Sequence, residues 1–135
     1  MGSLTRDNPD NRARAAAAGA IEAVVEAMAA LREAETVQWM ACEVLMLLVS
    51  DNDDNRARIA SAGGIEAVVE AMTAHRDAES VQQRACWALL KLAKDTGALA
   101  RMRAAGSVRL IRAAMAASDA SENTKKWGRE LLEKL

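Results

Sequence analysis

The sequence contains no Phe and no Tyr, and its only aromatic residues are Trp39, Trp87 and Trp127. β-Sheets are enriched in aromatic and β-branched residues, so an all-β core is disfavoured. The single proline, Pro9, lies near the start, so the rest of the chain lacks the residue that most strongly breaks helices. Abundant Ala, Leu, Met, Glu and Arg favour helix instead. At 135 residues, we expect one all-α domain.

A strong charge of either sign is also missing: the net charge is −1, with 18 basic and 19 acidic residues interspersed. This balance gives no field that would steer the chain to nucleic acid or to an anionic membrane. No apolar run approaches the length of a membrane span, and no signal peptide is recognisable. The two cysteines, Cys42 and Cys86, occupy equivalent positions, which favours reduced packing residues over a disulfide. We expect a cytoplasmic protein without nucleic-acid or membrane partners.

The residue patterns of catalysis and metal binding are absent as well. His75 is the only histidine and lies in a polar break, with no Cys or Ser at a spacing that would make a dyad. Cys42 and Cys86 lack the spacing of a zinc site. The segment 51–55 is rich in Asp and Asn but lacks the glycine and glutamate of a calcium loop, so we interpret it as a turn that caps a helix. We expect no enzyme activity, no cofactor and no metal.

What the sequence does contain is internal repetition. The segment Ile21–Met28 returns residue for residue at Ile65–Met72, and Gly19, Gly63 and Gly106 follow one another at intervals of 44 and 43 residues. A period of about 40–47 residues with only helical patterning is typical of α-solenoids. We place three copies at approximately 7–50, 51–94 and 95–135, the third being the most divergent.

Each copy is predicted to form three helices. We expect the first helix to end at the glycine, because glycine suits the left-handed position after a helix. A second helix follows, and the third carries one apolar stripe at helical spacing. In the middle copy the stripe is Val81, Ala85, Ala88, Leu89 and Leu92; in the first it is Val37, Ala41, Val44, Leu45 and Leu48; in the last it is Thr124, Gly128, Leu131, Leu132 and Leu135.

The segments 62–65 and 81–93 resemble the armadillo repeat, with its glycine turn and its Trp-Ala-Leu third helix. The resemblance implies a right-handed superhelix whose third helices line a groove that binds extended peptides or other proteins. In peptide-binding members a ladder of Asn clamps the peptide backbone and Trp residues form side-chain pockets. Here Trp87 keeps one Trp position, but the Asn positions hold Leu47, Lys91 and Lys134, and the other Trp positions hold Glu43 and Glu130. The Asn ladder is therefore missing.

The outward face of the first copy's third helix is apolar instead. It presents Trp39, Met40, Met46 and Leu47, and a helix that is apolar nearly all round must be buried on more than one side. Trp and Met are also enriched at the centres of interfaces. The alternative is that Trp39 or Met46 tucks into a neighbouring repeat. The candidate interface residues are Trp39, Met40, Glu43, Met46, Leu47, Arg84, Trp87, Leu90 and Lys91.

The two ends of the array differ. In the third copy Arg112 and Arg129 replace apolar residues, as in a polar C-terminal cap. Residues 4–7 align with the end of a third helix, and residues 1–3 look like an expression scar. We predict a non-enzymatic, engineered protein-interaction scaffold that forms a homodimer through the first repeat. The alternatives are a fragment of a longer natural array and a binder of a different protein or peptide.

Overall fold

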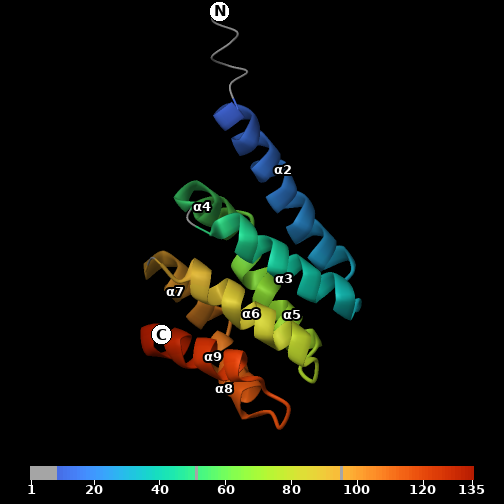
Figure 1. The fold of residues 1–135 in the computed structure, drawn as a ribbon, viewed down its shortest axis with the longest axis vertical. Helices are drawn as coiled ribbons and strands as arrows, with labels where there is room; N and C mark the ends of the chain where they lie inside the picture. Colours follow the sequence, from blue (N-terminus) through green and yellow to red (C-terminus); the bar gives the residue numbers. More distant parts are fainter. Residues whose placement is uncertain (1–8, 51, 95) are drawn as a thin grey trace, which may run out of the picture.

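The computed structural model describes the backbone of residues 9–50, 52–94 and 96–135, and the side chains of residues 17–50, 52–94 and 97–135. Over these ranges the chain forms eight helices and no strand, which confirms the predicted all-α class. The helices are α2 (Pro9–Ala30), α3 (Glu35–Val49), α4 (Asp53–Ser61), α5 (Gly64–Ala74), α6 (Glu79–Leu92), α7 (Thr96–Ala104), α8 (Ser107–Ala116) and α9 (Glu122–Lys134). The three copies follow one another down the long axis of the molecule, with α2 at one end and α8 and α9 at the other (Figure 1).

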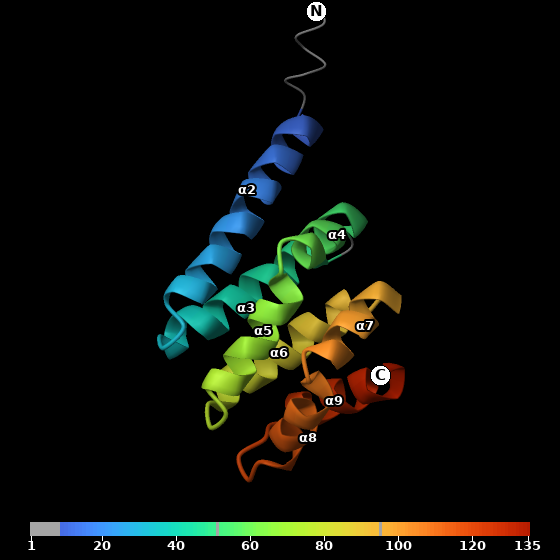
Figure 2. The ribbon, with the colours of Figure 1, turned by 180° about the vertical axis from the view of Figure 1, so that it is seen from behind.

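The third helices of the three copies, α3, α6 and α9, lie side by side (Figures 1 and 2). Each first helix packs on the copy before it: α4 contacts α2 and α3, and α7 contacts α5. Every copy is thereby covered by its neighbour in sequence, which is the arrangement of an α-solenoid. The predicted fold class is confirmed.

Two of the three turn glycines adopt the predicted conformation. Gly63 follows α4 and Gly106 follows α7, and both have φ of 84°, in the left-handed region that a side chain disfavours. Each donates its N–H to a carbonyl in the last turn of the preceding helix, that of Ala60 and that of Arg103. The first helices of the middle and last copies therefore end where the sequence predicts.

The prediction for Gly19 is wrong, because α2 runs through it without a break. Four residues before the other two glycines stand Ile59 and Met102, both fully buried, and folding the helix back brings them into the core. The equivalent residue of the first copy is Ala15, which has little apolar surface to bury. The alanine run 15–18 is also strongly helix-forming.

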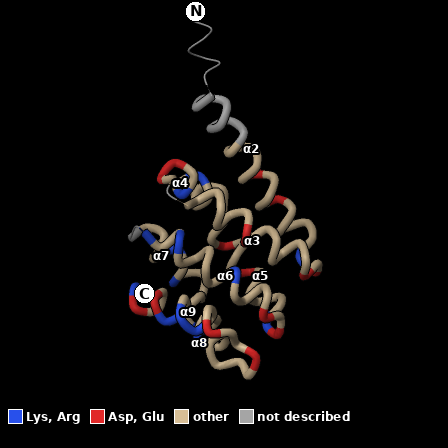
Figure 3. Tube along the Cα trace, in the orientation of Figure 1, with Lys and Arg blue, Asp and Glu red and all other residues tan. Residues whose placement is uncertain are grey.

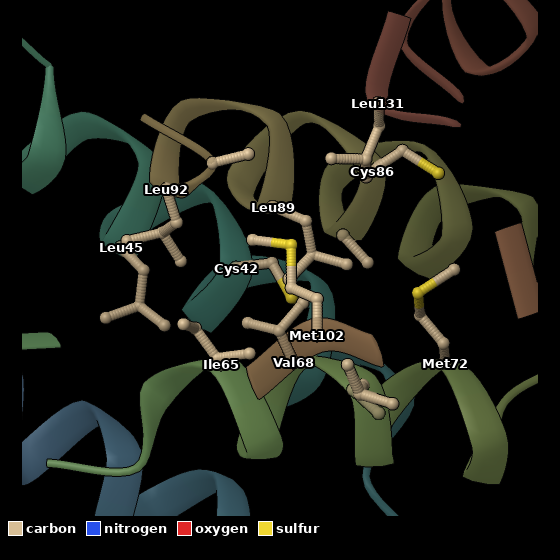
Figure 4. Packing of buried hydrophobic residues seen from close by; sticks show 14 of the residues in the cluster. Cys42, Leu45, Ile65, Val68, Met72, Cys86, Leu89, Leu92, Met102 and Leu131 are labelled. Atoms are coloured by element: carbon tan, nitrogen blue, oxygen red, sulfur yellow. The ribbon is translucent and has the colours of Figure 1, made fainter. Parts of the chain in front are cut away.

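The core runs through all three copies. All five residues of the middle-copy stripe are buried, as predicted. Figure 4 shows Leu45 of α3 and Leu89 and Leu92 of α6 among the side chains of this cluster, with Ile65 of α5 lying opposite them. The last copy adds Leu131, which is also fully buried. The third helices therefore supply one side of a continuous apolar core.

Two glutamines repeat the same structural role in the first and middle copies. Gln38 Nε2 donates to the carbonyl oxygens of Met28 (3.2 Å) and Leu31 (2.9 Å), where α2 ends. Gln82 Nε2 makes the equivalent pair of bonds where α5 ends. The last carbonyls of a helix lack partners within the helix, so each buried glutamine satisfies two of them. The turn between the second and third helices is fixed in this way.

Both cysteines are free thiols that are completely buried, which confirms their predicted role as packing residues. Burial raises the pKa of the Cys42 thiol from 9.0 to about 12, and that of Cys86 equally. A buried thiol that stays protonated is a weak nucleophile. Neither cysteine therefore has the setting of a reactive site.

We predict that neither thiol reacts with Ellman's reagent at pH 8 in the folded protein, whereas both react in urea. The unfolded thiols lose their protons at lower pH than the folded ones. The stability contributed by the buried thiols is thus complete below about pH 9 and is lost as the pH rises toward 12. The variant Cys42→Ala/Cys86→Ala should show a flatter decline in the free energy of unfolding over this range. Rapid labelling at pH 8 would contradict the prediction.

Candidate protein-interaction surface

The first contact between neighbouring third helices joins α3 to α6 through a charged residue. Arg84 Nε of α6 lies 3.0 Å from Glu43 Oε1 of α3. The same guanidinium lies over the ring of Trp39, with its carbon 4.5 Å from the ring centroid. Arg84 therefore combines an ion pair with a cation–π contact. These three predicted interface residues are brought together, and they bind one another within the chain.

The second contact joins α6 to α9 through two tryptophans. The rings of Trp87 and Trp127 are stacked with their centroids 4.6 Å apart and an angle of 12° between their planes. In the repeat alignment Trp87 occupies the position of Glu43, and Trp127 occupies that of Arg84. The same pair of positions thus makes both contacts. The Arg84 position always points to the preceding copy, and the Glu43 position to the following one.

This equivalence shows where the exposed apolar residues of α3 point. Met40 occupies the Arg84 position, which faces the preceding copy, but no described helix packs there. Met40 is 51% exposed, Val44 is 39% exposed and Leu47 is 63% exposed. The three lie at i, i+4 and i+7 and form one stripe along the helix. We call Met40, Val44 and Leu47 the bare stacking face.

The same face is covered where a neighbour exists. Ala88 of α6 is equivalent to Val44 and is fully buried, because α6 packs against α3 on that side. Val44 itself has no such cover. Its predicted place in the core stripe is therefore wrong, although Ala41 and Leu45 of the same stripe are buried, because the Val44 position is covered only by a preceding copy.

The predicted patch also needs correction at Met46, which is 4% exposed and belongs to the core. Trp39 is partly buried beneath Arg84. Of the four predicted patch residues, only Met40 and Leu47 are exposed, and Val44 joins them. The repeat alignment separates these residues. Val81 and Ala88 are buried in α6, and their positions mark the side of each third helix that faces the preceding copy.

The other predicted interface residues lie in a groove between α6 and α9. Trp87, Leu90 and Lys91 line it from α6, and residues of α9 form its second wall. The volume of the groove is about 470 Å³. The structure places these three residues together and away from the bare stacking face, on the following copy.

The opposite end of the array is polar. Arg112 of α8 and Arg129 of α9 are exposed, whereas Val69 and Cys86 at the equivalent positions of the middle copy are buried. The two arginines predicted to be polar replacements in the third copy are thus exposed to solvent. Lys126, Glu130 and Glu133 of α9 are also exposed. The two ends therefore differ in kind, one apolar and one charged.

Comparison with known proteins gives one match. Residues 52–94 match the family model of the Armadillo/beta-catenin-like repeat. No curated protein and no solved structure matches the chain. Within the described residues, no helix is long and apolar enough to cross a membrane, and no three His, Cys, Asp or Glu side chains are grouped so that they would hold a metal ion.

Proposed function

Because this chain belongs to the armadillo-repeat family, whose repeats are generally protein-interaction scaffolds, we propose that it is a non-enzymatic scaffold that pairs with a second copy of itself. The observation that carries the proposal is the bare stacking face, three large apolar side chains exposed in one stripe. Water contact with this surface costs about 25 cal/mol for each Å² of apolar area. A partner that covers it recovers that free energy.

A second copy of the chain offers the same apolar stripe, so two copies can cover each other about a two-fold axis. The alternative is a head-to-tail stack, in which the bare stacking face covers the C-terminal end of the next copy. That end exposes Arg129, Lys126 and Glu130. Covering charged groups with apolar side chains costs their hydration without giving them partners. We therefore favour the closed pair, which also stops at two copies.

The distribution of charge gives this pairing a distinctive salt dependence. Side chains of residues 7–50 carry a net charge of −4, those of 51–94 carry −1, and those of 95–135 carry +3. Figure 3 shows acidic residues along α2 and basic residues gathered around α7 and α9. A two-fold pair brings two acidic first repeats together, whereas a head-to-tail stack brings opposite charges together. Salt screens both interactions, because the Debye length falls from about 10 Å at 0.1 M to about 3 Å at 1 M.

We predict that size-exclusion chromatography with light scattering gives a dimer mass at micromolar concentration. Its dissociation constant should decrease as sodium chloride rises from 50 to 500 mM, since screening weakens the repulsion between the first repeats. A mass that grows beyond two copies and falls with salt would instead indicate head-to-tail stacking. A monomer mass at high micromolar concentration would contradict self-association and favour a different protein as the partner.

The near-identity of the first two copies supports an engineered origin for the scaffold. Eight consecutive residues of the second helix, Ile21–Met28, recur without change at Ile65–Met72. Of these, Glu22 and Ala23 are exposed, so packing alone does not require the identity. The residues that differ between the copies include Met40 and Leu47, which occupy the positions of Arg84 and Lys91. We infer that the difference serves association.

A further inference from the structure

Two pockets beside α5 lie at equivalent places, one at each junction between copies, and we call them the first and second junction pockets. The first lies between α2 and α5 and has a volume of about 300 Å³. The second lies between α5, the end of α7 and the start of α8, and its volume is about 540 Å³. Neither shares a lining residue with the groove between α6 and α9. In Figure 2, α5 and α8 lie in front of α6 and α9, so these pockets are on a different face of the molecule from that groove.

The repeat alignment shows that the two junction pockets are built from the same positions. Five lining positions are common to both: Ala29 with Thr73, Arg32 with Arg76, Gly63 with Gly106, Glu66 with Arg109, and Ala67 with Leu110. The charges, however, differ. Arg109 replaces Glu66, and Ala113 replaces Glu70, whereas Arg76 keeps the arginine of the first pocket. The two pockets can therefore be compared position by position.

The charges of the first junction pocket are balanced within the chain. Arg32 Nη2 lies 3.4 Å from Glu70 Oε1. The second carboxylate of the pocket also faces a cation, because Arg101 Nη1 lies 3.9 Å from Glu66 Oε1. The one arginine of this lining thus has an acidic partner.

The second junction pocket is lined by three arginines, Arg76, Arg103 and Arg109, and by no acidic residue. All three arginines are exposed, and none has an ion-pair partner within 4.0 Å among the described residues. Arg103 Nε donates to the carbonyl oxygen of Leu135 at 3.2 Å, which uses one of the five N–H groups of its guanidinium. The lining therefore carries a net charge of +3 that its own residues do not balance.

The start of α8 adds to this positive potential. The N-terminus of a helix carries a partial positive charge, which favours acidic residues in the first turn. α5 has Glu66 there, whereas α8 has no acidic residue in its first turn and carries Arg109 instead. An arginine at this position is unfavourable for the isolated chain, and a bound anion would offset both the arginine and the helix terminus.

The composition of the lining narrows the class of anion. Guanidinium groups bind phosphate with two parallel hydrogen bonds, and this geometry makes arginine the preferred residue for phosphate recognition. A phosphate group also carries up to two negative charges and three strong acceptor oxygens, so it can satisfy several arginines at once. The lining contains no aromatic residue on which a nucleobase could stack. A phosphate group without a base therefore suits the pocket best.

We propose that the second junction pocket binds a dianionic phosphate group, either free or carried on a side chain of a partner protein. Arg76 comes from the turn after α5, Arg103 from the end of α7 and Arg109 from the first turn of α8, so three separate elements hold the phosphate. The bare stacking face lies on α3, which does not line this pocket. Phosphate binding is consequently independent of the proposed self-association.

The test is phosphorus NMR of a heptapeptide of Gly and Ala with one central phosphoserine, titrated with the full chain. The wild-type chain should shift the phosphate resonance saturably, and the same peptide with unmodified serine should not compete. The variant Arg109→Glu/Ala113→Glu gives the second pocket the two acidic residues of the first, and both positions are exposed. It should weaken binding at least about tenfold, the loss expected when a charge-assisted hydrogen bond is removed.

Arg112→Glu is the matched control, because Arg112 is an exposed arginine of the same helix that does not line the pocket. It should change binding by less than about threefold. Circular dichroism of each variant checks that the helices are intact, and Arg109→Gln gives a milder variant if the charge reversal disturbs folding.

Competition with inorganic phosphate distinguishes the two sources of the ligand. If inorganic phosphate binds as tightly as the phosphoserine peptide, the pocket takes free phosphate; if it binds more weakly, the pocket takes a phosphorylated side chain. The absence of a saturable shift, equal competition by the unmodified serine peptide, or an equal loss in the Arg112→Glu control would overturn the proposal.

Discussion

The double variant Met40→Arg/Leu47→Lys should be folded and monomeric. The two exchanges give α3 the residues that the middle copy carries at the same positions, Arg84 and Lys91. Both side chains are more than half exposed in the single chain, so the array loses little packing when they become charged. In the proposed pair, by contrast, two charges would be buried against an apolar surface without partners, which is strongly unfavourable.

Truncation of an interface hot spot costs about 2 kcal/mol or more, which weakens a complex about thirtyfold. Both chains of a symmetric pair carry the two substitutions, so each loss of binding free energy occurs twice. We therefore expect no dimer at any practical concentration. Sedimentation velocity measures the mass, and circular dichroism measures the thermal midpoint. Leu31→Lys is the matched control, because Leu31 is 51% exposed and lies outside the bare stacking face. If the double variant melts at a much lower temperature than the wild type, these residues support the core.

Leu89→Ala should unfold the array or bring it close to unfolding. Leu89 is fully buried in α6, the helix that packs on both α3 and α9. Removing a buried leucine side chain costs roughly 2–5 kcal/mol, and a small domain has only about 5–15 kcal/mol of stability in total. Leu45→Ala, at the equivalent buried position of α3, should have a similar cost. Urea denaturation followed by circular dichroism gives the free energy of unfolding for each variant.

The volume-conserving exchange Leu89→Met separates packing from other effects of the substitution. It should cost less than about 1.5 kcal/mol, since methionine refills most of the space. A Leu89→Ala protein that keeps the urea midpoint of the wild type would show that α6 contributes little to the core. The buried stripe along this helix would then not be the main source of stability.

Much of the fold follows from the sequence because the repeat supplies it three times. The duplication gives the period, the glycines give the turns at Gly63 and Gly106, and the apolar spacing gives the stripe of α6. The prediction for Gly19 was wrong because a turn glycine permits a break in a helix but does not cause it. The cause is the burial of Ile59 or Met102, and the first copy has only Ala15 in that place.

The candidate surface was harder to predict, because its exposure depends on neighbours and not on the helix itself. Val44 and Ala88 occupy the same position, yet only Ala88 has another helix over it. Met46, predicted to point outward, is in the core instead, since the angular position of a residue on a helix does not state which side of that helix is covered. The groove between α6 and α9 needs the positions of two helices that are distant in sequence, so of its lining only Trp87, Leu90 and Lys91 were among the predicted interface residues.

The two junctions between third helices use different chemistry at equivalent positions, and this difference bears on which helices can pack together. The first two copies are nearly identical along their second helices, so these helices alone do not distinguish one junction from the other. Here the first junction requires an acid opposite an arginine, Glu43 with Arg84, and the second requires two stacked rings, Trp87 with Trp127. Placing α9 directly on α3 would leave Glu43 against an indole and Arg84 without its carboxylate. The two junctions are therefore not interchangeable, and their contacts favour one arrangement of the three repeats.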